Sequence, residues 1–498
     1  MHTLIEADEI VVGAGLTGLV YANVMAASGK RVVVVEKHTK PGGYASNFVR
    51  KRDYTFDCSL HKITGFGVNG NLSNALERAG LIDLLPFYPY QELTTIIHGS
   101  SRMTLPADGA QLEQFLLSRF PSAQEGLNAF FHDIKTVGYQ NYMLARMTLG
   151  EYEMDPELFL SSRKLNRMTT YEYLLSTFND RDLITILCAL AINLGVEAFE
   201  ADALYFLHFA YTFMYTEKRY VKGSSQSWSN ALAQELERRG GRLLLREEVT
   251  AIDISHSSIK GCSTRRYKIK APHMVWTGSP SQVSELAGDQ VPASFSNAFS
   301  ALEPGLGTFI VYLGLSETPE HCGFHKSDYL ITDTSYLDDA HHACHSDLRY
   351  ERWPLSISNY HLLDNQYGFV IQLEILDQMS DWFHLSRKDY KKKKECVAER
   401  ILDRAERSFP GLRRYIQYMD ISTPKTNYKF TNSLGGSAFG YKPVPRRNSR
   451  FLQHPPLSGL QFLGTWVNGA GYEPAMCLGF TAATLRSQQK TERTPSYA

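Results

Sequence analysis

Apolar and polar residues at the start of the chain follow the periods of a strand, a helix and a second strand. Residues 10–12 are a short apolar run, residues 16–27 carry apolar positions at helical spacing, and residues 31–35 are a second run rich in valine. Strand, helix and strand in this order are typical of a βαβ unit with parallel, buried strands. The pattern therefore predicts that a parallel sheet begins here.

The pattern changes twice along the rest of the chain. It is mostly helical from residue 111 to residue 220, and an α/β alternation returns at residues 228–254. Strand-like runs at 307–315 and 368–376 precede an amphipathic helix at 390–408. We predict an α/β fold of two discontinuous domains. The first comprises residues 1–95, 221–290 and 415–498; the second, a helical lobe with a sheet, comprises residues 96–220 and 291–414.

Composition and charge exclude several classes of protein. The 498 residues include 52 Lys and Arg against 52 Asp and Glu, so no broad basic field is present for nucleic acid. The seven cysteines are scattered without a Cys-x-x-Cys pair, and no secretory leader precedes the first strand, which favours a cytoplasmic protein. The longest apolar stretch, residues 183–196, is shorter than the roughly 20 residues of a membrane span.

A glycine-rich turn, residues 13–18 (GAGLTG), lies between the first predicted strand and the first predicted helix. In such a turn the first glycine permits a tight bend, the second lets a pyrophosphate approach the backbone, and the third lets helix and strand pack closely. Glu36 ends the second strand, where a carboxylate accepts hydrogen bonds from the ribose hydroxyls of an adenosine. This arrangement predicts a dinucleotide site of the Rossmann type.

A second glycine pair follows the acid, in residues 41–46 (PGGYAS). Because glycine lacks a side chain, the pair lets the chain run close to the remainder of a long, extended dinucleotide. FAD is therefore favoured over NAD.

Several segments together resemble a known family. Residues 13–46 are similar to the N-terminal FAD segment of the flavin amine oxidase and carotenoid desaturase superfamily. Residues 53–61, 409–412, 423–440 and 464–483 are similar to its branch of carotenoid isomerases, phytoene desaturases and retinol saturases. The resemblance covers nearly the whole chain. It implies a Rossmann-type FAD-binding domain of the glutathione-reductase and amine-oxidase kind, joined to a discontinuous α+β substrate domain.

The resemblance also implies which residues bind the cofactor. Thr465 stands where the family usually has an aspartate that contacts the ribityl chain, and Ser59 and Ser224 stand where it usually has glycine. Val249 lies in a strand that commonly meets adenine through its backbone. The cofactor residues implied in this way are Gly13, Ala14, Gly15, Thr17, Gly18, Glu36, Lys37, Gly42, Gly43, Tyr44, Ser46, Val249, Gly464, Thr465 and Tyr472.

His61 and Glu473 are the candidate catalytic residues, because the resemblance places both of their segments near the flavin ring. A histidine with an ordinary pKa of about 6.5 can move a proton at neutral pH. Each residue also has an ordinary interpretation. His61 follows a strand, where histidines are often structural, and Glu473 would be a solvated carboxylate in a loop.

Two other clusters carry weaker signals. His341, His342, Cys344 and His345 have the residue types of metal ligands, but no second cluster accompanies them, so we predict a solvated loop and no metal site. The four lysines at 391–394 suit contact with an anionic membrane surface or a carrier protein, although a solvated helix face is the more ordinary interpretation.

Aromatic residues are concentrated in one segment of the helical lobe. The chain contains 28 Tyr and 26 Phe, and residues 205–215 (YFLHFAYTFMY) hold an unusual density of rings. No single face of a helix can bury all of them in one core, so some are expected to line a cavity. We predict that Tyr211, Phe213 and Tyr215 bind a long apolar substrate.

These features predict an FAD-dependent oxidoreductase acting on carbon–carbon double bonds of a polyene, either a carotenoid-like isoprenoid or a polyene polyketide, free or bound to a carrier. Desaturation, saturation, isomerisation and reductive cyclisation stay open. Only one dinucleotide fingerprint is visible, so a net reduction would need transient NAD(P)H or another donor, and an oxidation would need oxygen or a quinone. A flavin amine oxidase and a non-catalytic flavin-fold binding protein are the alternatives, and the sequence does not indicate an oligomeric state.

Overall fold

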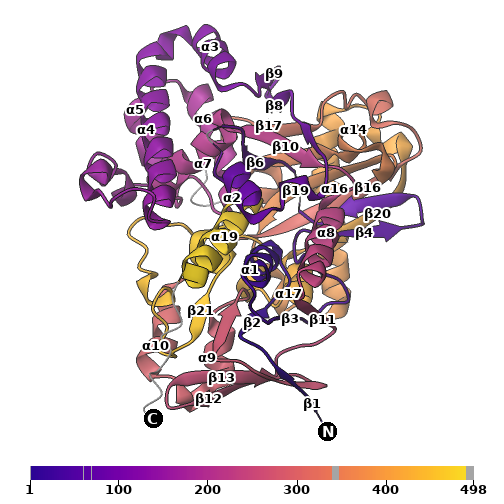
Figure 1. The fold of residues 1–498 in the computed structure, drawn as a ribbon. Coiled ribbons are helices and arrows are strands. Elements are labelled where there is room, and N and C mark those ends of the chain that lie inside the picture. The colour runs from indigo at the N-terminus through magenta and orange to yellow at the C-terminus, as the bar shows by residue number, and fades with distance from the viewer. Residues whose placement is uncertain (1, 60, 69, 339–346, 489–498) are drawn as a thin grey trace, which may run out of the picture.

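Figure 1 shows the computed structural model, which describes residues 2–59, 61–68, 70–338 and 347–488. The lower part of the molecule in this view holds the N-terminal strands, and the upper part holds the long helices and a large sheet. The cluster of His341, His342, Cys344 and His345 lies outside the described residues.

A five-stranded parallel sheet forms the centre of the first lobe. Its order is β11-β3-β2-β15-β21, and every neighbouring pair is parallel. The strands are Glu9–Val12 (β2), Val32–Glu36 (β3), Arg242–Leu245 (β11), His273–Trp276 (β15) and Leu460–Phe462 (β21). All five residues of β3 are buried, as expected for a central strand covered on both faces.

Alternate residues of these strands enter two different cores. Val32 and Val34 pack with the helices Leu16–Ala27 (α1), Ser225–Arg238 (α8) and Tyr472–Gln488 (α19). Val33 and Val35 pack toward a four-stranded sheet of order β1-β14-β13-β12. The strands of that sheet are Thr3–Glu6 (β1), Ala251–Ser255 (β12), Ser258–Ser263 (β13) and Tyr267–Lys270 (β14). The alternation of strand side chains thus builds a three-layer lobe.

The second lobe is built on a seven-stranded sheet of order β20-β16-β19-β18-β17-β8-β9, in which the pair of β17 and β8 is parallel and the other pairs are antiparallel. Its strands are Glu92–His98 (β8), Ser101–Pro106 (β9), Gly307–Leu315 (β16), Asp328–Thr332 (β17), Leu355–Asn359 (β18), Val370–Asp377 (β19) and Ile416–Ser422 (β20). All nine residues of β16 are buried. The sheet therefore packs against other elements on both faces.

The helical block packs into one core with this sheet. It comprises the helices Gly109–Arg119 (α3), Gln124–Thr148 (α4), Thr170–Thr177 (α5), Arg181–Ala189 (α6) and Ala203–Tyr215 (α7). Helix α16 (Arg387–Ser408) also contributes to this core. The remaining strands form two small sheets, one of β4 (Asn47–Arg50) and β5 (Tyr54–Asp57), and one of β6 (Ile63–Phe66), β10 (Glu217–Val221) and β7 (Phe87–Pro89). The remaining helices are Asn71–Ala79 (α2), Ser281–Ala287 (α9), Ala293–Ala298 (α10), Ser335–Asp338 (α11), Arg349–Arg352 (α13), Tyr360–Leu363 (α14), Ser380–Phe383 (α15), Pro424–Thr431 (α17) and Thr465–Asn468 (α18).

The strand pairing assigns two segments differently from the predicted domain boundaries. Strand β20, which falls in the predicted segment 415–498 of the first domain, pairs with β16 of the second lobe. Strand β8 begins at Glu92, inside the predicted segment 1–95, and pairs with β17. Both strands belong to the sheet of the second lobe, because β16 and β17 lie there. Local sequence patterns do not reveal these pairings, because the paired strands lie far apart in the sequence.

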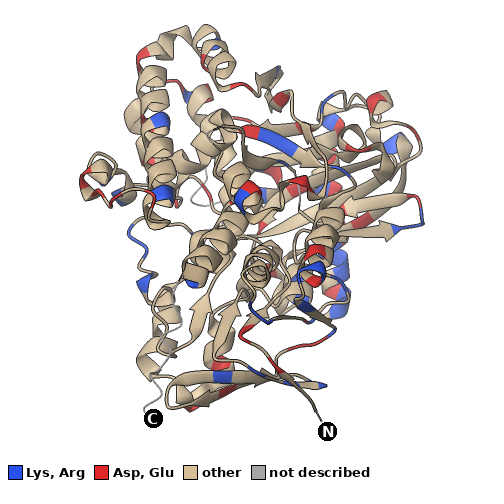
Figure 2. Cartoon of the chain, in the orientation of Figure 1, with Lys and Arg blue, Asp and Glu red and all other residues tan. Residues whose placement is uncertain are grey.

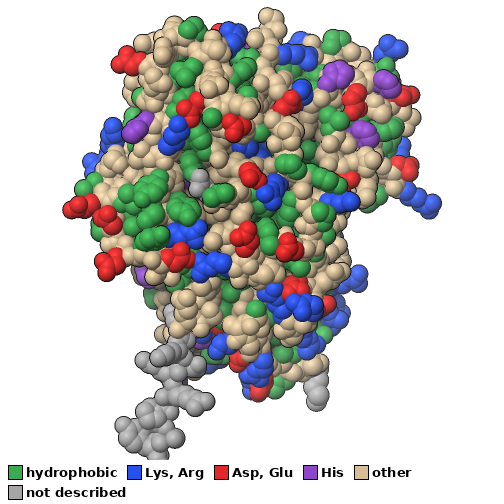
Figure 3. Space-filling view, turned by 45° about the horizontal axis from the view of Figure 1, so that its top comes forward, with side chains coloured by type: hydrophobic (Ala, Val, Ile, Leu, Met, Phe, Trp, Pro, Cys, Tyr) green, Lys and Arg blue, Asp and Glu red, His purple; other side chains and the backbone are tan. Residues whose placement is uncertain are grey.

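Charged residues of both signs are interspersed over both lobes (Figure 2). Lys391 and Lys392 are exposed on α16, whereas Lys393 lies over the ring of Trp382. Apolar side chains gather on the left of the face in Figure 3, the side on which Figure 1 places α4. None of the helices in the described part of the chain combines the length and the apolar character needed to cross a membrane.

Candidate active site

One cavity of about 980 Å³ extends from the glycine turn of the first lobe to the helical block and the sheet of the second lobe. Gly13, residues 15–17 and residues 42–45 line its first part. The face of α7 and one face of the seven-stranded sheet line its second part. A ligand bound at the turn and a ligand bound in the helical lobe would therefore share a single space.

The glycine turn is shaped by close backbone packing. Gly13 has φ +103°, a left-handed conformation that favours glycine, and a Cβ on Gly18 would lie 2.2 Å from the carbonyl oxygen of Gly13. Gly15 differs, because a Cβ added there would meet no atom within 4 Å. The first and third glycines thus hold the turn together, whereas the second keeps free a space in the cavity.

Glu36 is buried beside this turn and orders it. One carboxylate oxygen accepts a hydrogen bond from the backbone N–H of Ala14 at 2.8 Å, and the other accepts from the N–H of His38 at 2.8 Å. The second glycine pair is joined to the same turn, because Gly42 N–H donates to the carbonyl oxygen of Ala14 at 2.8 Å. The open space at Gly15, the N-terminus of α1 and the ordered carboxylate fit a dinucleotide.

The implied cofactor residues fall into two groups. Ala14, Gly18 and Ser46 do not line the cavity: Ala14 is engaged by Glu36, Gly18 packs against Gly13, and the Ser46 hydroxyl donates to Gly43 O at 2.9 Å. The residues that do line it are Gly13, Gly15, Thr17, Glu36, Lys37, Gly42, Gly43, Tyr44, Val249, Gly464, Thr465 and Tyr472.

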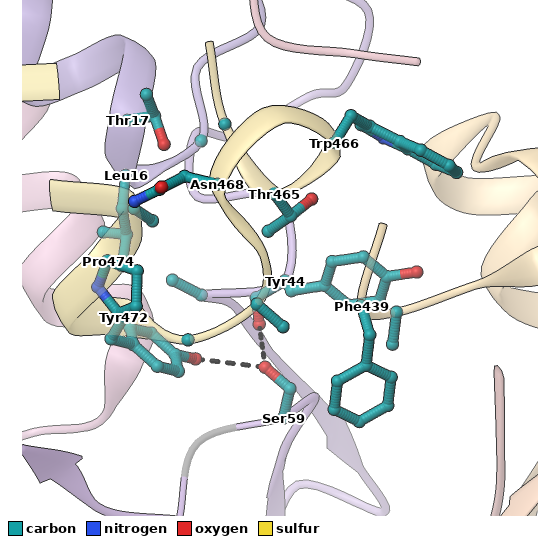
Figure 4. A pocket seen from close by; sticks show the side chains of 18 of the residues that line it. Leu16, Thr17, Tyr44, Ser59, Phe439, Thr465, Trp466, Asn468, Tyr472 and Pro474 are labelled. Carbon is teal, nitrogen blue, oxygen red and sulfur yellow. Dashed lines mark hydrogen bonds between the residues drawn. The ribbon is translucent and has the colours of Figure 1, made fainter. Parts of the chain in front are cut away.

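The C-terminal segment closes over the turn (Figure 4). Gly464 has φ +96° and directly precedes the short helix α18. Thr465 and Asn468 of α18 line the same cavity as Leu16 and Thr17 at the start of α1. Tyr472 and Ser59 are hydrogen-bonded through their hydroxyls at 3.1 Å, and Ser59 donates to Tyr44 O at 3.0 Å. This chain of contacts joins three segments that are far apart in the sequence.

Glu473 lies in the first turn of α19, which begins at Tyr472. Its side chain is 6% exposed, so the interpretation as a solvated loop carboxylate is wrong. Burial raises the pKa of Glu473 to about 7, although a hydrogen bond from the Thr64 hydroxyl at 2.6 Å acts in the opposite direction. A carboxyl with this pKa can hold or release a proton near neutral pH.

His61 also lines the cavity, but it is already paired. Its Nε2 lies 3.0 Å from a carboxylate oxygen of Glu374, and its Nδ1 lies 2.6 Å from the hydroxyl of Ser358. Burial lowers the pKa of His61, but the hydrogen bond and charge of Glu374 outweigh it, so the net pKa is raised above 6.5. The pairing with Glu374 thus stabilises the protonated form of His61.

The aromatic helix presents one face to the cavity. Tyr205, His208, Phe209, Thr212 and Phe213 line it, at the spacing of successive turns of α7. Burial lowers the pKa of His208 to about 4, so this histidine is neutral at neutral pH. The periodicity of residues 205, 209 and 213 was the signal that could have identified this face.

Two of the three predicted substrate residues do not line the cavity. Tyr211 packs against Gly138 of α4, and its ring stacks on that of Tyr215 with the ring centroids 5.8 Å apart. The Tyr215 hydroxyl donates a hydrogen bond to Glu113 of α3 at 2.6 Å. The assignment of Tyr211 and Tyr215 to the substrate is corrected here, because both residues join α7 to its neighbouring helices. Phe213 lies on the cavity wall.

Sequence reasoning also missed several residues that line the cavity. Phe439, Trp466 and Asn468 surround the C-terminal turn, and Lys62, Asp328 and Glu374 lie toward the seven-stranded sheet. No local motif marks the last three, because they come from separate segments. No group of metal-ligating side chains occurs among the residues that the structure describes.

Comparisons with known proteins place these observations in context. Residues 11–79 match the family described as NAD(P)-binding Rossmann-like domain. The chain is 25% identical to a prolycopene isomerase of Daucus carota, with 98% of this chain and 82% of the relative covered. It is 22% identical to an all-trans-retinol 13,14-reductase of Danio rerio, with 96% and 86% covered. A solved double mutant of putrescine oxidase has a TM-score of 0.65 at 14% identity, with 97% and 99% covered.

These findings confirm the resemblance predicted from the sequence and the predicted fold class. The likeness to putrescine oxidase concerns the fold alone, because its sequence identity is low.

Replacing Gly15 by Val is expected to weaken binding of a dinucleotide, FAD in the proposal below, by about tenfold or more, because the added side chain occupies the space through which the pyrophosphate approaches the protein backbone. The φ of −72° at Gly15 suits any residue, so the variant should fold. The measurement is the FAD-to-protein ratio after purification. In contrast, Gly18→Val should reduce the yield of folded protein, because its Cβ collides with backbone. Normal FAD content in the Gly15 variant would contradict this assignment.

Glu473→Gln is expected to remove a pH-dependent part of the stability. Because burial raises the folded pKa from 4.5 to about 7, the wild-type free energy of unfolding falls as pH rises between these values, by about 3 kcal/mol. The glutamine keeps an acceptor for Thr64 and does not titrate. Denaturant unfolding at saturating FAD is measured at one pH below this window and at one pH above it. The free energy of unfolding of the variant, relative to that of wild type, should be greater at the higher pH. An equal difference at both pH values would contradict the raised pKa.

Proposed function

We propose that this chain is an FAD-dependent oxidoreductase that acts on carbon–carbon double bonds of a long apolar polyene. The observation that carries the proposal is the single cavity, which joins the dinucleotide turn to the aromatic face of α7. A conjugated chain with few polar groups needs a long apolar wall, and Phe209 and Phe213 contribute to such a wall.

The names of the relatives support the same reaction class. A prolycopene isomerase and an all-trans-retinol 13,14-reductase both match over nearly the whole chain. The reaction of this chain stays open among desaturation, saturation, isomerisation and reductive cyclisation. A polyene such as a carotenoid-like isoprenoid or a polyene polyketide, free or bound to a carrier, suits the cavity.

The bound flavin would supply exchange of a hydride with a carbon atom of the substrate. The residues of the chain bind, orient and handle protons around it. Glu473 is neutral over part of the physiological range, and because Thr64 donates to its Oε2, the other oxygen is available to hold a proton. Net reduction would draw on transient NAD(P)H or another donor, and net oxidation would pass electrons to oxygen or a quinone.

The purified holoprotein is expected to convert a conjugated polyene and to leave primary amines unchanged. Oxidised and reduced holoprotein are each incubated with candidate polyenes, and product mass distinguishes loss of two hydrogens, gain of two hydrogens and isomerisation. In parallel, anaerobic amines are added while flavin absorbance at about 450 nm is followed. Bleaching by amines together with inert polyenes would favour an amine oxidase, and neither reaction would favour a binding protein.

Phe213→Ala is expected to weaken polyene binding by about tenfold, because it removes an aromatic ring from the cavity wall. Tyr211→Ala serves as the matched variant on the same helix: it should lower the melting temperature by loosening the contact of α7 with α4, with little change in polyene affinity. FAD content should be normal in both. Equal polyene affinity in wild type and the Phe213 variant would contradict the assigned wall.

A further inference from the structure

Four charged side chains line the part of the cavity that borders the seven-stranded sheet: His61, Lys62, Asp328 and Glu374. Lys62 Nζ lies 2.8 Å from Asp328 Oδ2, and each of these side chains is only 8% exposed. His61 Nε2 lies 3.0 Å from Glu374 Oε2. A buried ion pair of Lys62 and Asp328 and a hydrogen-bonded pair of His61 and Glu374 therefore place polar groups in a cavity that is otherwise suited to an apolar substrate.

The sheet holds this cluster in place. Asp328 is the first residue of β17 and lies opposite Ser358 of β18, whose hydroxyl contacts His61 Nδ1 at 2.6 Å. Glu374 is in β19, the next strand in the sheet. His61 and Lys62 directly precede β6. Side chains fixed on paired strands keep their positions when a ligand binds, which is typical of a recognition site.

Lys62 retains the capacity to bind a ligand. An ammonium group has three N–H donors. Asp328 accepts from one side, and the ring of Tyr90 lies 5.0 Å from Nζ on another. Asp328 Oδ2 is further satisfied by the Ser327 hydroxyl at 2.7 Å. The ion pair thus leaves at least one N–H of Lys62 for an acceptor in the cavity.

A pure hydrocarbon would be a poor match for this part of the cavity. Filling it would displace the remaining water from Lys62 and from the pair of His61 and Glu374 without supplying hydrogen bonds, and buried polar groups left unpaired are costly. An oxygen atom at the end of the ligand would replace that water instead. Because a ligand without the oxygen leaves these polar groups unpaired, it binds more weakly than a ligand that has the oxygen.

We propose that Lys62 and Asp328, with the neighbouring pair of His61 and Glu374, form a polar subsite that binds an oxygen-bearing end of the polyene. The bound group is an acceptor, a carbonyl or carboxylate oxygen, that takes a hydrogen bond from Lys62. This inference rests on the proposed function and narrows its substrate class from long apolar polyenes in general to polyenes that carry an oxygen at one end.

The test compares three polyenes of the same carbon skeleton that end in a methyl group, an aldehyde and a carboxylate. Each is titrated into the FAD-loaded protein, and binding is read from the change in flavin absorbance. Wild type is expected to bind at least one oxygenated polyene about tenfold or more tightly than the methyl-terminated one, as expected for a hydrogen bond to a charged group. Preference for the carboxylate alone would identify an anion, and equal affinity for the aldehyde would identify a carbonyl; both support the subsite.

The decisive variant is Lys62→Met with Asp328→Leu, which removes the ion pair without leaving a buried charge unpaired. It should lose most of the preference for the oxygenated polyenes and bind the methyl-terminated polyene at least as tightly as wild type does, with normal FAD content. Lys326→Met is the matched control, because Lys326 pairs with Glu92 outside this cavity, and it should retain the preference.

Two outcomes would overturn the subsite while leaving the proposed function intact. One is equal affinity of wild type for all three polyenes, and the other is a double variant that weakens all three equally, which would indicate a purely structural ion pair. Failure of wild type to bind or convert any polyene would overturn the proposed function together with the subsite.

Discussion

The position of helix α1 depends on close approaches that only glycine permits. A Cβ on Gly18 would lie 2.2 Å from Gly13 O, and a Cβ on Gly479 would lie 2.5 Å from Thr17 O. The first contact sets the distance from α1 to its preceding turn, and the second sets the distance from α1 to α19. Since Glu473 is in the first turn of α19, this packing also determines how near the Glu473 carboxyl lies to the glycine turn of residues 13–18.

The carboxyl groups around the cavity differ in the partners that they contact. Glu473 receives a hydrogen bond from a neutral hydroxyl, which is insufficient to offset desolvation, so its pKa rises to about 7. Asp328 and Glu374 instead have basic partners, Lys62 at 2.8 Å and His61 at 3.0 Å. One cavity thereby holds a buried carboxyl with a raised pKa and, apart from it, two carboxyl groups that contact basic side chains.

The helical lobe contributes a wall rather than a reactive group. Along α7, Phe209 and Phe213 face the cavity, while Tyr211 and Tyr215 face α3 and α4. Tyr205 reaches the C-terminal turn, where its hydroxyl would collide with any Cβ on residue 469, a glycine with φ +90°. The same helix therefore joins the apolar wall to the segment that closes over the dinucleotide turn.

The sequence by itself determined the βαβ unit, the glycine turn with Glu36, the dinucleotide class and the resemblance to carotenoid isomerases and retinol saturases. These features are local: a period of a few residues or a short motif is sufficient to specify them. Tertiary structure alone decided that the face of α7 with Tyr205, Phe209 and Phe213 borders the cavity, that Glu473 is buried, and that His61 pairs with Glu374, 313 positions away. Burial and the pairing of charges depend on contacts between distant segments, and no local period or motif encodes those contacts.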